Sequence, residues 1–237
     1  MSAPWAVVQY DNRPIHAYKN LVQRNKEYCK RHGYEYVFES RDFGLPPYWV
    51  KVRLVLEILE TGRYAGVLWL DTDAVVHDLS RPLDSLLVAD SVFYYCGDAP
   101  PYSSPFCAAV WFIRDCNIAR RMMFSWMSLY DPSSWNCVAG SWTTTGPWAG
   151  DTYEQGSFVS SMFPWYHDVI YAYPWSLLQG TAATDTSFIL HFARSSICPE
   201  KHGPLVAYLK ESRIIMIIRR ILARCWNHHK SEHASKE

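Results

Sequence analysis

Two aspartates separated by one residue are the strongest chemical signal in the chain. Residues 66–76 (GVLWLDTDAVV) begin with an apolar run typical of a buried strand, and Asp71 and Asp73 follow it directly. In open α/β sheets ligands bind at the carboxyl ends of strands, and oxygen donors there favour Mg²⁺ or Mn²⁺. Two neighbouring carboxylates repel each other unless a cation lies between them. The spacing therefore favours a divalent metal site, although turn or helix-cap aspartates also fit these letters.

Two classes of enzyme use such a motif. In a sugar-nucleotide-dependent glycosyltransferase the aspartates hold a metal and a diphosphate. In a phosphatase of the haloacid-dehalogenase type, Asp71 would be the nucleophile and Asp73 its acid–base partner. Residues 71–75 (DTDAV) resemble the phosphatase motif D-x-D-x-[TV] closely, but two strand-like segments precede them. Residues 150–155 (GDTYEQ) have Gln155 where that family needs a second aspartate, so the context favours glycosyl transfer.

The elements that must position this motif alternate between strands and helices. Apolar stripes of helical period predict helices over residues 18–32, 48–61 and 117–130. Short apolar and aromatic runs predict strands over residues 5–10, 34–38, 66–70, 92–96, 109–113, 169–173 and 187–192. This alternation indicates an α/β sheet with parallel strands near the N-terminus. Residues 131–151 show no period, and we expect a long functional loop there.

Composition excludes several classes of protein. The chain has 237 residues, 49% hydrophobic and 19% charged, which suits one globular domain and excludes a disordered one. Its 23 basic residues balance 23 acidic ones, so no nucleic-acid partner is expected. The 7 cysteines form no C-x-x-C pair and indicate reduced thiols. Without a signal peptide or membrane span we expect a cytoplasmic or soluble protein, or a Golgi protein if the sequence is a trimmed domain.

The aromatic residues suggest a third hypothesis. The chain contains 11 Trp and 16 Tyr residues, whose flat faces suit sugar rings but also fill cores. A non-catalytic carbohydrate-binding module would use the tryptophan-rich residues 131–151. In an enzyme the candidates for an acceptor platform are Trp142, Trp148, Trp165 and Trp175.

The C-terminal part of the sequence has a different character. Residues 203–226 combine an apolar stripe with interspersed Lys and Arg, which predicts a basic amphipathic helix. Such a helix contacts an anionic membrane surface or a partner protein, or docks on its own domain. We therefore divide the chain into a catalytic domain over residues 1–196 and a helical extension over residues 197–237.

Five segments, in order, resemble a known group of enzymes. They are residues 25–34 (NKEYCKRHGY), 49–51 (WVK) leading into 68–73 (LWLDTD), 109–114 (AVWFIR), 154–158 (EQGSF) and 189–193 (ILHFA). These segments resemble the GT-A-fold glycosyltransferases with a D-x-D motif, in particular the galactosyl-, mannosyl- and xylosyltransferase-like group and its microbial and viral relatives. The resemblance covers most of residues 5–195. It implies a Rossmann-like, mixed but mainly parallel sheet flanked by helices.

The resemblance also implies a metal site and its ligands. Asp71 and Asp73, with Thr72 between them, would bind the metal and the diphosphate of the donor. His191 would be the third protein ligand, and an imidazole among carboxylates would favour Mn²⁺ over Mg²⁺. By position alone, a histidine near the end of an apolar strand is more often a hydrogen-bonded core residue.

The same resemblance implies a nucleotide-sugar donor, UDP-linked rather than GDP-linked, and a hydroxyl of a glycan or glycoprotein as acceptor. The first strand should end beside the nucleotide base. There Tyr10 would stack on the base, or else fill the core, and Gln9 or Asp11 would accept hydrogen bonds. Lys51 would approach the donor, although a solvated lysine fits its position equally well.

The sequence departs from the group's pattern at three places. Residues 107–109 (CAA) replace the usual Asn and Gly of the sugar site. Arg194 stands in place of a glycine and would either face the departing diphosphate or block the family's tight turn. Glu154 replaces the usual Asp.

Transfer needs a carboxylate or amide beside the sugar or the acceptor hydroxyl, and the candidates are Glu154, then Asp151 and Gln155. Glu154 also fits a helix cap.

Overall fold

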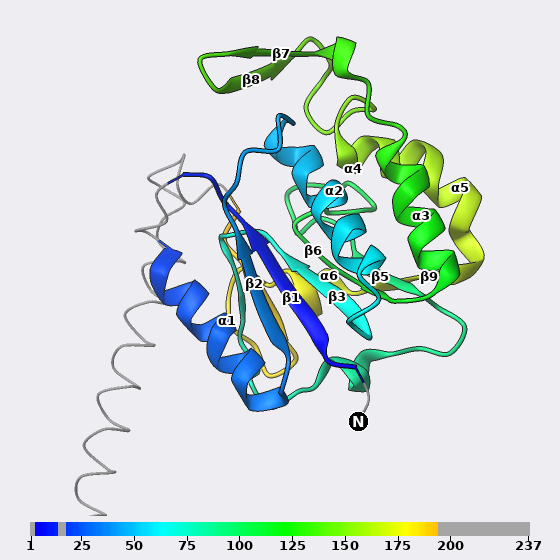
Figure 1. Cartoon of the computed structure of the whole chain (residues 1–237). Coiled ribbons are helices and arrows are strands. Elements are labelled where there is room, and N and C mark those ends of the chain that lie inside the picture. The colour runs from blue at the N-terminus through cyan, green and yellow to red at the C-terminus, as the bar shows by residue number, and fades with distance from the viewer. Residues whose placement is uncertain (1–2, 14–17, 194–237) are drawn as a thin grey trace, which may run out of the picture. The chain divides into compact units, whose positions relative to one another are not determined.

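The computed structural model describes residues 3–13 and 18–193, and its centre is a six-stranded sheet (Figure 1). The strand order is β2-β1-β3-β6-β5-β9. Neighbouring strands are parallel, except that β6 is antiparallel to both β3 and β5. The strands are β1 (Trp5–Tyr10), β2 (Glu35–Glu39), β3 (Gly66–Leu70), β5 (Phe93–Cys96), β6 (Val110–Arg114) and β9 (Ile170–Tyr173). The predicted mixed, mainly parallel α/β sheet is therefore confirmed.

Three long helices cover the two faces of this sheet. They are α1 (Lys19–His32), α2 (Pro47–Glu60) and α3 (Asn117–Met127). Figure 1 shows α1 on the opposite side of the sheet from α2 and α3. Because side chains alternate along a strand, Val7 and Leu68 enter the core beside α1, whereas Val8 and Trp69 enter the core beneath α2 and α3. The sheet is therefore buried on both faces, as expected for parallel strands.

The helix ends follow local chemistry. Helix α1 stops where Gly33 adopts a left-handed φ of 69°, which costs glycine little. Helix α2 begins at Pro47, a residue that suits the first helical turn because no hydrogen bond is lost there. All three predicted helices are confirmed, although α3 ends at Met127 rather than at Tyr130.

A small second sheet extends the motif-bearing strand. Strand β4 (Ala74–Val76) pairs antiparallel with β10 (Ile189–His191), and His191 lies opposite Ala74. This pairing brings the late histidine to the Asp71–Asp73 turn, although the two are far apart in the sequence.

The expected loop over residues 131–151 contains a β-hairpin, which corrects the sequence-based prediction. Strands β7 (Trp135–Val138) and β8 (Ser141–Thr144) pair antiparallel. The two turn residues, Ala139 and Gly140, have φ values of 50° and 79°, the left-handed conformations that a tight hairpin requires. The strands escaped detection because the hairpin is mostly exposed and so lacks a buried, alternating apolar face.

The remaining elements are short. They are η2 (Leu83–Leu86), η3 (Pro132–Ser134), α4 (Glu154–Ser157), the π-helical η4 (Phe158–Met162), α5 (Phe163–Tyr166), η5 (His167–Val169) and α6 (Trp175–Leu178).

The chain divides into two compact units, Met1–His191 and Phe192–Glu237. The predicted basic helix over residues 203–226 and Arg194 lie outside the described residues, so the proposed contact with a membrane or partner stays a prediction. Within residues 3–13 and 18–193, none of the helices has the length and apolar character needed to cross a membrane.

Candidate active site

Asp71 is the first residue after β3, and its carboxylate is held from two sides. Trp69 Nε1 donates to Asp71 Oδ1 at 2.8 Å, and Lys51 Nζ donates to the same oxygen at 3.0 Å. The backbone N–H of Asp71 donates to Ala109 O at 2.8 Å, just before β6 begins. The Asp71 side chain keeps 32% of its surface exposed. Asp71 is therefore fixed in orientation yet open to a ligand.

Thr72 and Asp73 complete a tight turn between β3 and β4. Ala74 N donates to Asp71 O at 2.9 Å across the turn. The buried Thr72 hydroxyl donates to Tyr10 O at 3.1 Å, so the end of β1 anchors the turn. The motif thus lies at the carboxyl ends of β1 and β3, where open α/β sheets bind their ligands.

Asp71, Asp73 and His191 come together at this edge. One ligand atom from each of the three lies within 4.8 Å of the others. His191 Nε2 is 3.3 Å from Asp73 Oδ1, and both side chains are only partly buried. Two carboxylates and one imidazole form a donor set that suits a divalent cation and tilts selection toward Mn²⁺. The three residues predicted as metal ligands therefore fit a shared ion.

Asp73 and His191 stabilise each other's charge. Burial alone would raise the pKa of Asp73, but the neighbouring His191 holds that pKa below its ordinary value. Burial alone would lower the pKa of His191, but Asp73 raises it above the usual range. A proton on His191 Nε2 therefore faces the same carboxylate that a bound cation would face. A cation can bind through Nε2 only after that proton has left.

A buried ion-pair network lies behind Asp71. Lys51, on α2, is 5% exposed and Glu154, the first residue of α4, is 3% exposed. Lys51 Nζ lies 3.3 Å from Glu154 Oε1 and also donates to Ala108 O at 3.1 Å. Burial alone would lower the pKa of Lys51, but Asp71 and Glu154 raise it, so the lysine stays charged. Burial raises the pKa of Glu154, and Lys51 offsets only part of that effect.

The residues predicted to contact the nucleotide base are engaged with other protein groups. Gln9 is fully buried, donates to Asp71 O at 3.1 Å and accepts from Asn25 and Tyr36. The Asp11 carboxylate accepts hydrogen bonds from Arg13 at 2.9 and 3.0 Å. Tyr10 packs edge-on against Phe43, with 5.8 Å between ring centroids. Their role in binding a nucleotide stays a prediction.

The three candidates for the transfer step occupy different environments. Glu154 lies in the network with Lys51, and its Oε2 has no hydrogen-bond partner among the residues that the structure describes. Gln155 Oε1 accepts from Ala108 N at 3.1 Å, which ties α4 to the segment before β6. Asp151 is exposed. Of the three, only Glu154 shares a charged partner with the Asp71 carboxylate.

Three residues with clear roles in this architecture were not predicted as site residues. Trp69 orients Asp71, a contact that their spacing of two in an extended segment makes feasible. Asn25 donates to Ala74 O at 3.1 Å and accepts from Val76 N at 2.8 Å, which fixes α1 to β4. Gln179 Oε1 lies 2.8 Å from His191 Nδ1. No local pattern marks Gln179, because it follows α6 and its partner His191 belongs to β10.

Comparison with known proteins agrees with this architecture. The sequence profile of the galactosyl transferase GMA12/MNN10 family matches residues 6–93, which include the Asp71–Asp73 motif. The fold is similar to that of a glycosyltransferase involved in the glycosylation of the major capsid of PBCV-1. That similarity has a TM-score of 0.61 and 17% identity over 80% of this chain and 94% of the viral protein. No curated protein sequence matches the chain significantly.

Two other solved structures show weaker similarity. A glycosyltransferase of Streptococcus pneumoniae has a TM-score of 0.43 and 14% identity over 72% of this chain and 45% of its own. A Drosophila β1,4-galactosyltransferase 7 mutant in complex with manganese, UDP-Gal and xylobiose has a TM-score of 0.44 and 10% identity over 81% of this chain and 72% of its own.

The profile match favours glycosyl transfer over the phosphatase and over a non-catalytic module. The sequence match and the fold together make the chain a glycosyltransferase with a GT-A fold.

Proposed function

We propose that the protein transfers a sugar from a nucleotide-diphosphate sugar to a hydroxyl of a glycan or glycoprotein. A UDP-linked donor is proposed ahead of a GDP-linked one, with Mn²⁺ or Mg²⁺ as cofactor. The observation that carries this proposal is the convergence of Asp71, Asp73 and His191 to within 4.8 Å at the carboxyl end of β3. Such an ion would act as a Lewis acid on the departing diphosphate.

The side chains around this set are suited to hold it in one geometry. Trp69 and Lys51 fix the Asp71 carboxylate, while the β4–β10 pairing fixes His191 relative to Asp73. Pre-fixed groups stabilise developing charge without reorganising during the reaction. In this proposal Lys51 acts from behind Asp71, and Asp71 and Asp73 face the donor.

Glu154 is the carboxylate that we propose for the transfer step. Its Oε1 is held by Lys51, while its Oε2 is buried without a partner in the described part of the chain, an unsatisfied acceptor that a hydroxyl of a bound sugar or acceptor would satisfy on reaching it. Asp151 and Gln155 stand as the second and third candidates. A base that takes the acceptor proton gives inversion, and a group on the sugar's other face gives retention.

Calorimetric titration with UDP and GDP, in Mn²⁺ and after chelation with EDTA, tests the proposal. We expect UDP to bind in Mn²⁺ and to lose at least about tenfold in affinity after chelation, since 1.4 kcal/mol of metal–diphosphate interaction already gives that factor. Tighter binding of GDP would overturn the UDP preference alone. Failure of both nucleotides in both conditions would overturn the proposed function.

An aromatic cluster beside Glu154 is suited to the acceptor. Tyr48, Trp135, Trp148 and Tyr153 contact one another with ring centroids 5.0 to 5.9 Å apart. Tyr48 precedes Lys51 by one helical turn and Tyr153 directly precedes Glu154, so the cluster adjoins the buried network. Trp148 is 61% exposed. We propose that its ring contacts a sugar of the glycan acceptor, since such rings offer apolar faces to aromatic side chains.

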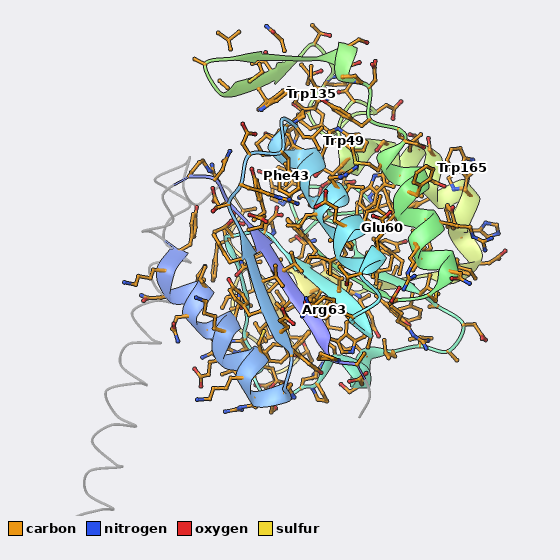
Figure 2. All side chains as sticks on the ribbon, viewed as in Figure 1. Phe43, Trp49, Glu60, Arg63, Trp135 and Trp165 are labelled. Carbon is orange, nitrogen blue, oxygen red and sulfur yellow. The ribbon has the colours of Figure 1, made fainter. Side chains whose placement is uncertain are left out.

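The segment that carries Trp148 is held rigidly. Gly150 N donates to Pro147 O at 3.0 Å, and Ala149 adopts a φ of 56°, which is strained for a residue with a side chain. Gly156 packs so closely that an added Cβ would lie 2.2 Å from Gly150 O. Figure 2 shows Trp135 at the hairpin and Trp49 below it on α2, and both indoles donate to Thr152 O. A rigid platform loses little entropy on binding.

Replacing Trp148 with alanine is expected to weaken acceptor binding about tenfold, because one aromatic contact of about 1.4 kcal/mol changes an equilibrium constant by that factor. The measurement is saturation-transfer NMR with a panel of oligosaccharides. Trp148→Tyr should keep most of the affinity. Trp165, another of the platform candidates from the sequence, is the comparison, since it is 59% exposed but lies on α5, away from the hairpin (Figure 2). Equal losses in Trp148→Ala and Trp165→Ala would contradict the platform.

A further inference from the structure

Gln179 is a buried amide placed against the histidine of the metal-ligand set. It follows α6 directly and is 2% exposed. Its Oε1 lies 2.8 Å from His191 Nδ1 and accepts from Cys107 Sγ at 2.9 Å. The backbone fixes this approach, because His191 N donates to Gly180 O at 3.0 Å. The main chain next to Gln179 is therefore fixed against the strand that carries His191.

The other end of the amide determines which atom faces the histidine. Gln179 Nε2 donates to Cys96 Sγ at 3.2 Å and lies 3.5 Å from Gly97 O. A backbone carbonyl oxygen only accepts hydrogen bonds, so the amide nitrogen must be the atom that faces Gly97. The amide oxygen then faces His191, and Nδ1 must donate to it. This geometry puts a proton on Nδ1.

We propose that Gln179 is a positioning residue that keeps the His191 proton on Nδ1 and thereby directs the Nε2 lone pair to the divalent cation. The inference rests on the metal site of the proposed function. His191 Nε2 already lies 3.3 Å from Asp73 Oδ1, on the side where the carboxylates converge. A ligating histidine commonly donates its other ring N–H to an oxygen, which fixes both the tautomer and the ring orientation.

The first test compares Mn²⁺ affinity, measured by electron paramagnetic resonance of the free ion, in the full chain and three variants. Gln179→Met removes the acceptor with little change in volume, and we expect the Kd to rise by about 10- to 100-fold. Gln179→Glu keeps an oxygen opposite Nδ1 and should stay within about threefold of the native chain. Cys96→Ala is the matched control, since it removes a hydrogen bond at the other end of the same amide and should leave the Kd unchanged.

The second test reads the tautomer directly and needs no metal. Nitrogen-15 NMR of the histidine rings, with His191→Ala to assign the signal, should show a proton on His191 Nδ1 in the native chain, and this proton should exchange faster with solvent in Gln179→Met. A native His191 ring without a proton on Nδ1 overturns the inference, as does an unchanged Mn²⁺ affinity in Gln179→Met. If the native chain binds no Mn²⁺ at all, the proposed metal site fails, and the NMR result still decides the tautomer.

Discussion

Replacing Lys51 with methionine is expected to lower the free energy of unfolding by about 3–5 kcal/mol, the usual cost of removing one partner from a buried ion pair. Lys51 Nζ contacts Asp71 at 3.0 Å and Glu154 at 3.3 Å, and both Lys51 and Glu154 are almost fully buried. Without the ammonium group, Glu154 is left as an uncompensated carboxylate in the interior. Urea denaturation at pH 7 measures the change.

The penalty should depend on pH in a defined direction. In the native chain burial already raises the pKa of Glu154 above 4.5, and losing Lys51 removes the effect that opposes this rise. A carboxyl group with a raised folded pKa favours the folded state while protonated, and that stability is lost as the pH rises from 4.5 through the folded pKa. The destabilisation by Lys51→Met should therefore be smallest in acid and grow toward neutral pH.

Two further variants separate the buried charge from other effects. Lys51→Met combined with Glu154→Gln should recover much of the lost stability, because the uncompensated charge is gone. Lys30 is exposed on α1, and Lys30→Met should change stability by less than about 0.5 kcal/mol. A loss that is independent of pH and is not relieved by the second substitution would show that packing of the lysine stem, rather than its charge, stabilises the fold.

Replacing Asp73 with asparagine is expected to abolish detectable Mn²⁺ binding and to lower the rate of sugar transfer by at least about 1,000-fold. A Lewis-acid cation stabilises a transition state by several kcal/mol, and each 1.36 kcal/mol is a factor of ten in rate. The measurement combines released nucleoside diphosphate, with UDP-sugar as donor, and electron paramagnetic resonance of free Mn²⁺.

The fold should survive this substitution. Asparagine preserves the shape of the side chain, and His191, whose pKa is raised by the Asp73 carboxylate, can lose its proton once that carboxylate is gone. Asp168→Asn is the matched control, because the Asp168 side chain is 86% exposed and lies outside the site. An Asp73→Asn variant that binds Mn²⁺ as tightly as the native chain would show that the cation is held elsewhere.

Much of the fold follows from local sequence patterns. The apolar run before Asp71 predicts β3 with its bounds, because a strand buried on both faces needs a continuous hydrophobic segment. The placement of Asp71 and Asp73 at its carboxyl end follows from the same pattern. The hairpin of β7 and β8 does not, since its residues are mostly solvated and carry no periodic signal.

The partners of the site residues lie beyond local patterns. Lys51 and Glu154 belong to α2 and α4, and only the packing of these two helices brings the ammonium and carboxylate groups together. Gln9 shows the same limit. The sequence places it near the end of β1, but its hydrogen bonds with Asn25 and Tyr36 depend on two other elements. Spacing identifies which groups are available, and tertiary packing decides their partners.

The pairing of β4 with β10 also sets an order of events during protein synthesis. A chain is made from its N-terminus, so Asp71 and Asp73 leave the ribosome well before His191. Until β10 has been synthesised and has paired with β4, the nascent chain has two of the three ligands and lacks the imidazole. A polypeptide interrupted between β4 and β10 therefore has the sequence motif without the complete ligand set, and only a chain completed through His191 can present all three ligands together.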